Sequence, residues 1–118
     1  MSDVEDFLPL TPVAFHMLAA LAGEARHGYG IMQEVRERSD GAVRIGAGTL
    51  YTALKRMLDD GLVRELENAG GADDANDRRR TYTLTALGQS VLRADAKRLE
   101  QMVLYAREKR ILGARARS

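Results

Sequence analysis

The stretch from residue 85 to residue 112 constrains the fold most strongly, because it predicts one long amphipathic helix. Thr85 is a good N-cap residue, and apolar side chains follow in alternating steps of four and three residues, a heptad-like pattern. At 1.5 Å per residue this helix would be about 42 Å long, more than the residues before it can cover. The apolar stripe therefore needs a partner, most simply the same helix of a second chain. The predicted dimer interface consists of Leu92, Ala96, Leu99, Met102, Val103 and Ala106.

Three shorter helices are predicted before it. Thr11-Pro12 is a typical helix start and begins a helix over 12–22, which Gly23 ends. The second helix covers 28–38 and stops before Gly41. The third lies within 46–63, where apolar residues recur at helical spacing up to Gly61.

The periodicity then changes to that of a sheet. The segments LVRELE at 62–67 and RRTYTLT at 79–85 place β-branched, aromatic and Leu residues in near alternation. The intervening NAGGADDANDR has the composition of a turn. The predicted fold is mainly α with a small β-hairpin: a winged helix-turn-helix domain over 8–84, followed by a dimerisation helix over 85–112.

The helix within 46–63 has an unusual polar face. Its first two turns expose hydroxyls and cations but no carboxylate, namely Thr49, Tyr51, Thr52, Lys55 and Arg56. In a helix-turn-helix unit, hydrogen-bonding side chains early in the recognition helix meet base edges in the major groove, and neighbouring cations meet phosphates. The arginines at 78–80 would add cations beside the wing. This pattern favours double-stranded DNA as the partner.

The chain resembles the PadR-like transcriptional regulators. The resemblance covers about residues 8–112 and rests on four segments in order: LTPVAFHMLAAL, HGYGI at 27–31, GTLYTALKRMLDDGLV at 48–63 and RRRTYTLTALG at 78–88. It implies a dimeric repressor that binds an inverted-repeat operator, with the last helix at the dimer interface. With both arguments, the candidate DNA-binding residues are Tyr29, Gly48, Thr49, Tyr51, Thr52, Lys55, Arg56, Arg78, Arg79 and Arg80.

Two departures from the family pattern bear on specificity. Thr52 stands where many members have Pro after the Tyr of GTLY, which should keep the helix but change its polar surface and operator preference. The chain has no Trp, so stacking of flat aromatic drugs on Trp, as in some relatives, does not carry over. A small-molecule effector between the long helices is an alternative, and no residue identifies it.

Structural alternatives exist for several candidates. Thr49 could be the N-cap of its helix, and Tyr51 could pack against the wing. Lys55 and Arg56 could form a solvated face. At the start of the second helix, Gly28 and Gly30 would permit close helix packing, and Tyr29 could either meet a phosphate or fill a gap. The cations of the arginine run could pair with wing carboxylates at Asp73, Asp74 and Asp77.

Composition narrows the function classes. The net charge is only +1, yet residues 93–118 hold eight cations and three carboxylates. This near-neutral total keeps a rival open, a winged-helix module that binds another protein rather than DNA. Cysteine is absent, the two histidines lie in different helices, and His16 is interpreted as a packing residue. We therefore expect no enzymatic activity, cofactor or metal site, and the absence of a signal sequence or apolar span favours a cytoplasmic protein.

Overall fold

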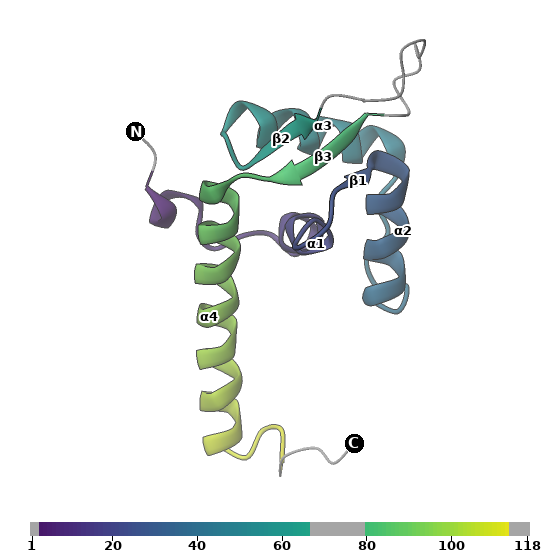
Figure 1. The fold of residues 1–118 in the computed structure, drawn as a ribbon. Helices are drawn as coiled ribbons and strands as arrows, with labels where there is room; N and C mark the ends of the chain where they lie inside the picture. Colours follow the sequence, from purple (N-terminus) through teal and green to yellow (C-terminus); the bar gives the residue numbers. More distant parts are fainter. Residues whose placement is uncertain (1–2, 67–79, 114–118) are drawn as a thin grey trace.

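A computed structural model describes residues 3–66 and 80–113 of the chain. Helices dominate and a small antiparallel sheet joins them, so the predicted fold class is confirmed (Figure 1). In chain order the elements are η1 (Val4–Phe7), α1 (Pro12–Ala20), β1 (Arg26–His27), α2 (Gly28–Arg38), α3 (Ala47–Asp59), β2 (Val63–Leu66), β3 (Thr81–Leu84) and α4 (Ala86–Glu108).

Threonine caps begin two of the helices, as predicted. The Thr11 hydroxyl accepts a hydrogen bond from the Ala14 amide (3.0 Å) at the start of α1. The Thr85 hydroxyl accepts from the Gly88 amide (3.0 Å) and donates to the carbonyl of Gly61 (2.5 Å). The cap of α4 is therefore also tied to the turn that follows α3. Helix α1 ends at Ala20, slightly before the predicted residue 22.

Different local features determine where α3 begins and where it ends. Gly46 is the N-cap residue, so Thr49 lies three residues inside the helix, and its alternative role as the N-cap is wrong. At the other end Gly61 adopts a φ of +79°, a conformation that glycine reaches without strain. The Leu62 amide then donates to the Met57 carbonyl (2.9 Å) and the Gly61 amide to the Leu58 carbonyl (3.1 Å), a Schellman ending.

The sheet has three strands rather than the predicted two. The predicted hairpin is present as β2 and β3, with Val63 opposite Leu84 and Leu66 opposite Thr81. A third strand, β1, pairs with the other edge of β3 and gives the order β1-β3-β2. A two-residue strand has no periodicity of its own, so only its partner strand defines it. The predicted loop between β2 and β3 lies outside the described residues.

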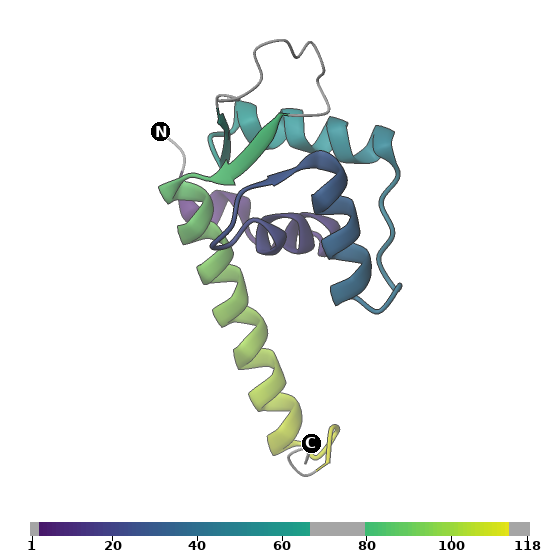
Figure 2. The same ribbon diagram turned by 45° about the vertical axis from the view of Figure 1, so that its right-hand side comes forward.

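One hydrophobic core joins the helices to the sheet. The inward faces of α1, α2 and α3 meet there with the start of β2 and the first part of α4 (Figure 2). Its most deeply buried apolar side chains are Met17, Leu18, Leu21, Ile31, Val35, Leu50, Leu54, Val63 and Val91. This core fixes α3 with its inner stripe buried and its polar face outward.

Helix α4 begins on this core and then leaves it. Its first part contacts α1 and η1, while its C-terminal part extends away from the rest of the domain (Figures 1 and 2). It ends at Glu108 rather than at 112, so its length is about 34 Å rather than about 42 Å. The ending is again a Schellman motif, but Arg110 has the positive φ of +61° that is usually left to glycine.

Candidate nucleic-acid interface

The two faces of α3 differ sharply in exposure. Leu50, Leu54 and Met57 are buried in the core. The polar candidates lie on the outer side, and all are exposed: Gly48, Thr49, Tyr51, Thr52, Lys55 and Arg56. The local pattern of α3 therefore places the predicted set on one accessible surface, and the side chains on the two edges of that surface have different neighbours.

Tyr51 occupies the edge of α3 nearest α2. A Cβ atom at Gly28 would collide with the Tyr51 hydroxyl and approach its Cζ to 2.9 Å, so the phenol ring lies directly on the first residue of α2. Gly28 therefore permits close packing of α2 against α3, as predicted. The Tyr51 side chain is still 44% exposed, which leaves part of the ring accessible beside this contact.

The opposite edge of α3 borders a groove. Gly48, Thr49, Thr52 and Arg56 line it from the α3 side, and it has a volume of about 900 Å³. The other wall is mostly apolar and comes from η1 and the start of α1. Two carboxylates, Asp6 and Asp60, also line the groove, so this edge is less purely cationic than the first two turns of α3 suggest.

Lys55 has a carboxylate partner that was not predicted from the sequence. Its Nζ lies 3.6 Å from Oδ2 of Asp59, one turn later, and both side chains are well exposed. An exposed pair of this kind contributes little to stability. Lys55 can therefore exchange its partner for a phosphate or a base edge at small cost.

Of the three predicted wing arginines, Arg80 is the one that the structure describes. Its Nε lies 3.3 Å from Oε2 of Glu65, so this cation pairs across the β2–β3 ladder. Arg78 and Arg79, and the wing carboxylates that were considered as their partners, lie outside the described residues. Next to this pair Tyr82 is buried, and desolvation by burial, followed by the nearby Glu65 and Tyr51, raises the pKa of its phenol.

Tyr29 projects from the first turn of α2. It is 65% exposed, so the predicted alternative in which it fills a gap is wrong within this chain. It shares a small cleft with Arg36 and Arg44, two cations that were not among the predicted site residues. Tyr29 and Arg36 are seven residues apart and therefore lie on one face of α2. This spacing could have indicated from the sequence that the two side chains share a surface.

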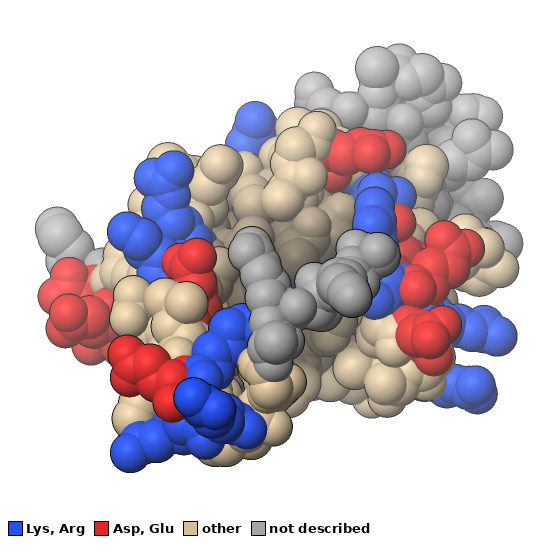
Figure 3. Space-filling model, turned by 90° about the horizontal axis from the view of Figure 1, so that it is seen from below, with Lys and Arg blue, Asp and Glu red and all other residues tan. Residues whose placement is uncertain are grey.

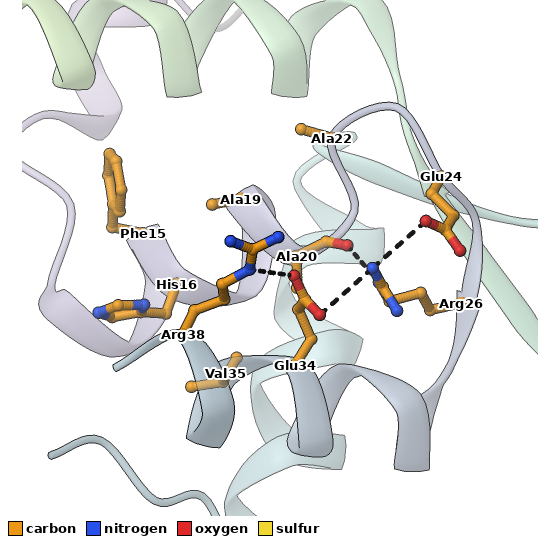
Figure 4. Close-up of a pocket in the computed structure, with 10 residues that line it drawn as sticks. All are labelled: Phe15, His16, Ala19, Ala20, Ala22, Glu24, Arg26, Glu34, Val35 and Arg38. Carbon is orange, nitrogen blue, oxygen red and sulfur yellow. Dashed lines mark hydrogen bonds and ion pairs between the residues drawn. The ribbon is translucent and has the colours of Figure 1, made fainter. Parts of the chain in front are cut away.

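Another pocket lies between α1 and α2, and several of the side chains that line it form ion pairs (Figure 4). Arg26 donates to the Ala20 carbonyl (2.6 Å) and lies 3.4 Å from carboxylate oxygens of both Glu24 and Glu34. Glu34 in turn pairs with Arg38 at 2.9 Å. These pairs satisfy one another, which favours a structural role for the network.

His16 lines the α1–α2 pocket next to Phe15, and their rings meet edge to face with centroids 6.2 Å apart. This contact agrees with the interpretation of His16 as a packing residue. Among the described residues there is no cluster of three His, Asp or Glu side chains suited to a metal ion. In the same part of the chain, every helix is too short or too polar to cross a bilayer.

Comparison with known families identifies the family to which this winged-helix architecture belongs. The model of the transcriptional regulator PadR-like family matches residues 17–94, more than half of the chain. The chain belongs to the PadR-like family. This confirms the resemblance inferred from the four sequence segments and makes the chain a transcriptional regulator of the DNA-binding, winged-helix type.

Individual relatives of this PadR-like regulator agree with the assignment. A PadR family transcription regulator from hypervirulent Clostridium difficile R20291 is 28% identical, with a TM-score of 0.63, over 87% of this chain and 100% of that one. A transcriptional regulator from Clostridium thermocellum shares the fold at 21% identity and a TM-score of 0.66, over 92% of this chain and 96% of that one.

A curated relative is similar to this chain in sequence. It is an uncharacterized 37.1 kDa protein in transposon TN4556 of Streptomyces fradiae, 38% identical over 80 residues. The match covers 68% of this chain but only 21% of that relative's length. The shared part is therefore about a fifth of the larger protein.

Proposed function

We propose that this PadR-like regulator is a homodimeric repressor that binds an inverted-repeat operator in double-stranded DNA. The observation that carries the proposal is the uncovered C-terminal half of α4. Four consecutive apolar or aromatic side chains there are between 42% and 60% exposed, an unusual concentration for a small monomeric domain. They are Met102, Val103, Leu104 and Tyr105.

The surface beneath α1 is suited to bind a second copy of the chain. Seen from below, uncharged side chains line a hollow, and charged side chains gather mainly to its left and right (Figure 3). Phe15, Ala19 and Ala22 of the α1 region point away from the ion pairs of α2, toward the side on which α4 lies (Figure 4). The small alanine side chains would let a helix approach closely, so α4 of the second copy could pack against both α1 and α4.

The DNA contacts follow from the exposed face of α3. We assign base contacts to Thr49, Tyr51, Thr52 and Lys55, because the N-terminal part of a recognition helix lies deepest in the major groove. Arg56 and Arg80 would meet phosphates at the two sides. The exposed Arg80–Glu65 pair is weak and can yield to a phosphate. In a two-fold dimer two such helices face the same side of the DNA. The preferred site is then an inverted repeat with half-sites about 10 base pairs apart, or a multiple of that spacing.

Selection of bound duplexes from random DNA tests this proposal. The expected result is an inverted repeat, bound with an affinity that falls steeply as salt concentration rises, because phosphate contacts release counterions. Selected sites without two-fold symmetry would contradict the dimeric mode. Failure to enrich any duplex would favour the rival, a winged-helix module that binds a protein through α3.

Substitution of Lys55 then tests the face of α3. We expect Lys55→Ala to weaken binding by about 1–3 kcal/mol and to relax the preference at particular operator positions. Lys97→Ala on α4 removes the same side chain far from α3 and is the matched control. If the selected sequence is the same for Lys55→Ala as for the unmodified protein, the assigned face of α3 is wrong.

A further inference from the structure

The cleft beside Tyr29 lies outside the α3 and wing surfaces to which DNA contacts are assigned above, although Tyr29 itself is a predicted DNA-binding residue. It has a volume of about 230 Å³ and is formed between one face of α2 and the turn that leads into α3. Tyr29, Gln33 and Arg36 stand on that face at positions i, i+4 and i+7, which align on an α-helix. The six lining residues are Tyr29, Met32, Gln33, Arg36, Arg44 and Ile45.

All the charged side chains that line this cleft are positive. Its lining includes two arginines and no carboxylate. Within the described part of the chain, ion pairs engage Arg26, Arg38, Lys55, Arg80 and Arg98, but neither Arg36 nor Arg44. Both of these arginines are exposed. Two arginines that line one cleft without a carboxylate, beside a phenol and an amide, match the donors that bind a phosphodiester group.

The turn holds Arg44 in place before any ligand binds. The Ser39 hydroxyl accepts a hydrogen bond from the Val43 amide (2.9 Å), and Nε of Arg44 donates to the Gly41 carbonyl (3.3 Å). Arg44 stands two residues before Gly46, the N-cap of α3. The cleft is therefore lined by residues that immediately precede, in sequence, the N-terminal end of the recognition helix, where DNA would pass.

We propose that this cleft binds a backbone phosphate of the DNA at the flank of the half-site that α3 reads. This inference rests on the proposed function and extends it. Arg36 and Arg44 supply the charge, while Tyr29 and Gln33 supply neutral donors. The contact fixes the position of α3 in the groove but reads no base, so it strengthens binding to all sequences alike.

The test is the salt dependence of operator binding by the full chain. Arg36→Gln combined with Arg44→Gln should weaken binding roughly tenfold or more. It should also make the plot of log K against log salt concentration less steep, by about 0.9 for each phosphate that the variant no longer neutralises. The selected consensus sequence should not change. Arg36→Lys with Arg44→Lys keeps the charges and should restore most of the slope.

Arg38→Gln is the matched control. It removes one positive charge from the same end of α2, but Arg38 pairs with Glu34 on the opposite face of the helix. Thermal unfolding and sedimentation would confirm that each variant is folded and in the same assembly state. An unchanged slope in the Gln double variant, or an equal loss of affinity in Arg38→Gln, would overturn the inference. If the unmodified chain bound no duplex with salt dependence, the proposed function itself would fail.

Discussion

The two halves of α4 share one helical periodicity but have opposite surroundings. In the first half Gly88, Val91 and Asp95 are buried against the rest of the domain. In the second half the large apolar side chains are about half exposed, from Val103 at 42% to Tyr105 at 60%. The comparison teaches that helical periodicity indicates which side chains require burial, whereas only the three-dimensional structure shows what buries them.

Leu92 and Leu104 make this difference concrete. Leu92 was predicted in the dimer interface; its side chain is half-buried and packs partly against the core of its own chain, so its place in the interface stays a prediction. Ala96, at the boundary, is exposed, and Leu99 is half-buried. Leu104 and Tyr105 lie off the heptad-like stripe and were not predicted, yet they are exposed beside Met102 and Val103.

The largest expected effect comes from a charge in the projecting half. Val103→Glu should weaken dimerisation by about 3–5 kcal/mol, because a carboxylate would be buried without a partner in the interface. The unfolding of the monomer by urea should change little. Gln101→Glu introduces the same charge at an exposed position of the same helix and should leave the dimer intact. Equal effects of the two variants, measured by sedimentation equilibrium, would show that Val103 is not in an interface.

A methyl group added in the anchored half of α4 should instead lower the stability of the folded domain. A Cβ atom at Gly88 would lie 2.9 Å from the carbonyl carbon of Leu62 and nearer still to its oxygen, so the start of α4 would have to move. We expect Gly88→Ala to lower the free energy of unfolding by about 3 kcal/mol, as overpacking against backbone does. Gly48→Ala is the control, because a Cβ atom there meets nothing within 4 Å. Unfolding of Gly88→Ala at the urea concentration of the unmodified chain would refute this account of the anchored half.

Asp95 provides a smaller test of the same half. It is the one buried charged side chain of the described residues, and its Oδ1 accepts from Arg98 Nε (2.8 Å) and from the Leu10 amide (3.4 Å). Asp95→Ala should cost about 2 kcal/mol of stability, because both donors lose their acceptor. Asp95→Asn keeps an acceptor oxygen and should cost less. An Ala variant as stable as the Asn variant, by urea unfolding, would mean that these hydrogen bonds do not secure the N-terminal segment to α4.

The smallest effect concerns alkaline pH. Because the pKa of Tyr82 is raised in the folded protein, the folded state holds this proton more tightly than the unfolded state. Its contribution to stability is complete below the ordinary tyrosine pKa of about 10 and is lost as pH rises through the raised value. Tyr82→Phe should therefore reduce the loss of stability above about pH 10. Tyr29→Phe, on α2 and outside the proposed dimer interface, is the matched removal of an exposed phenol. Identical alkaline unfolding curves for Tyr82→Phe and the unmodified chain would contradict this cause.

Local signals in the sequence predicted much of the fold. The caps at Thr11 and Thr85 and the turn at Gly61 depend on neighbouring residues, and all three are present. Strand β1 was missed because its two residues are ordered by pairing with β3, more than fifty positions away. The end of α4 was misplaced because Arg110 occupies a position where a glycine would normally signal the stop.

The candidate site was predictable only in part, for a related reason. Helical spacing places the polar residues of α3 on one face, and the structure shows them exposed there. The partners of Lys55 and Arg80 depend on side-chain reach and on the register between β2 and β3. Arg44 lies in a turn without periodicity, so its position next to Arg36 follows only from the folded path of the chain.

Sedimentation equilibrium of the unmodified chain at micromolar concentration tests the central claim most directly. The claim is that the projecting half of α4 is covered by a second copy of the same chain. The account predicts a single species with twice the mass of the chain, which Val103→Glu converts to one chain mass without unfolding. A monomeric unmodified chain at that concentration would contradict the account.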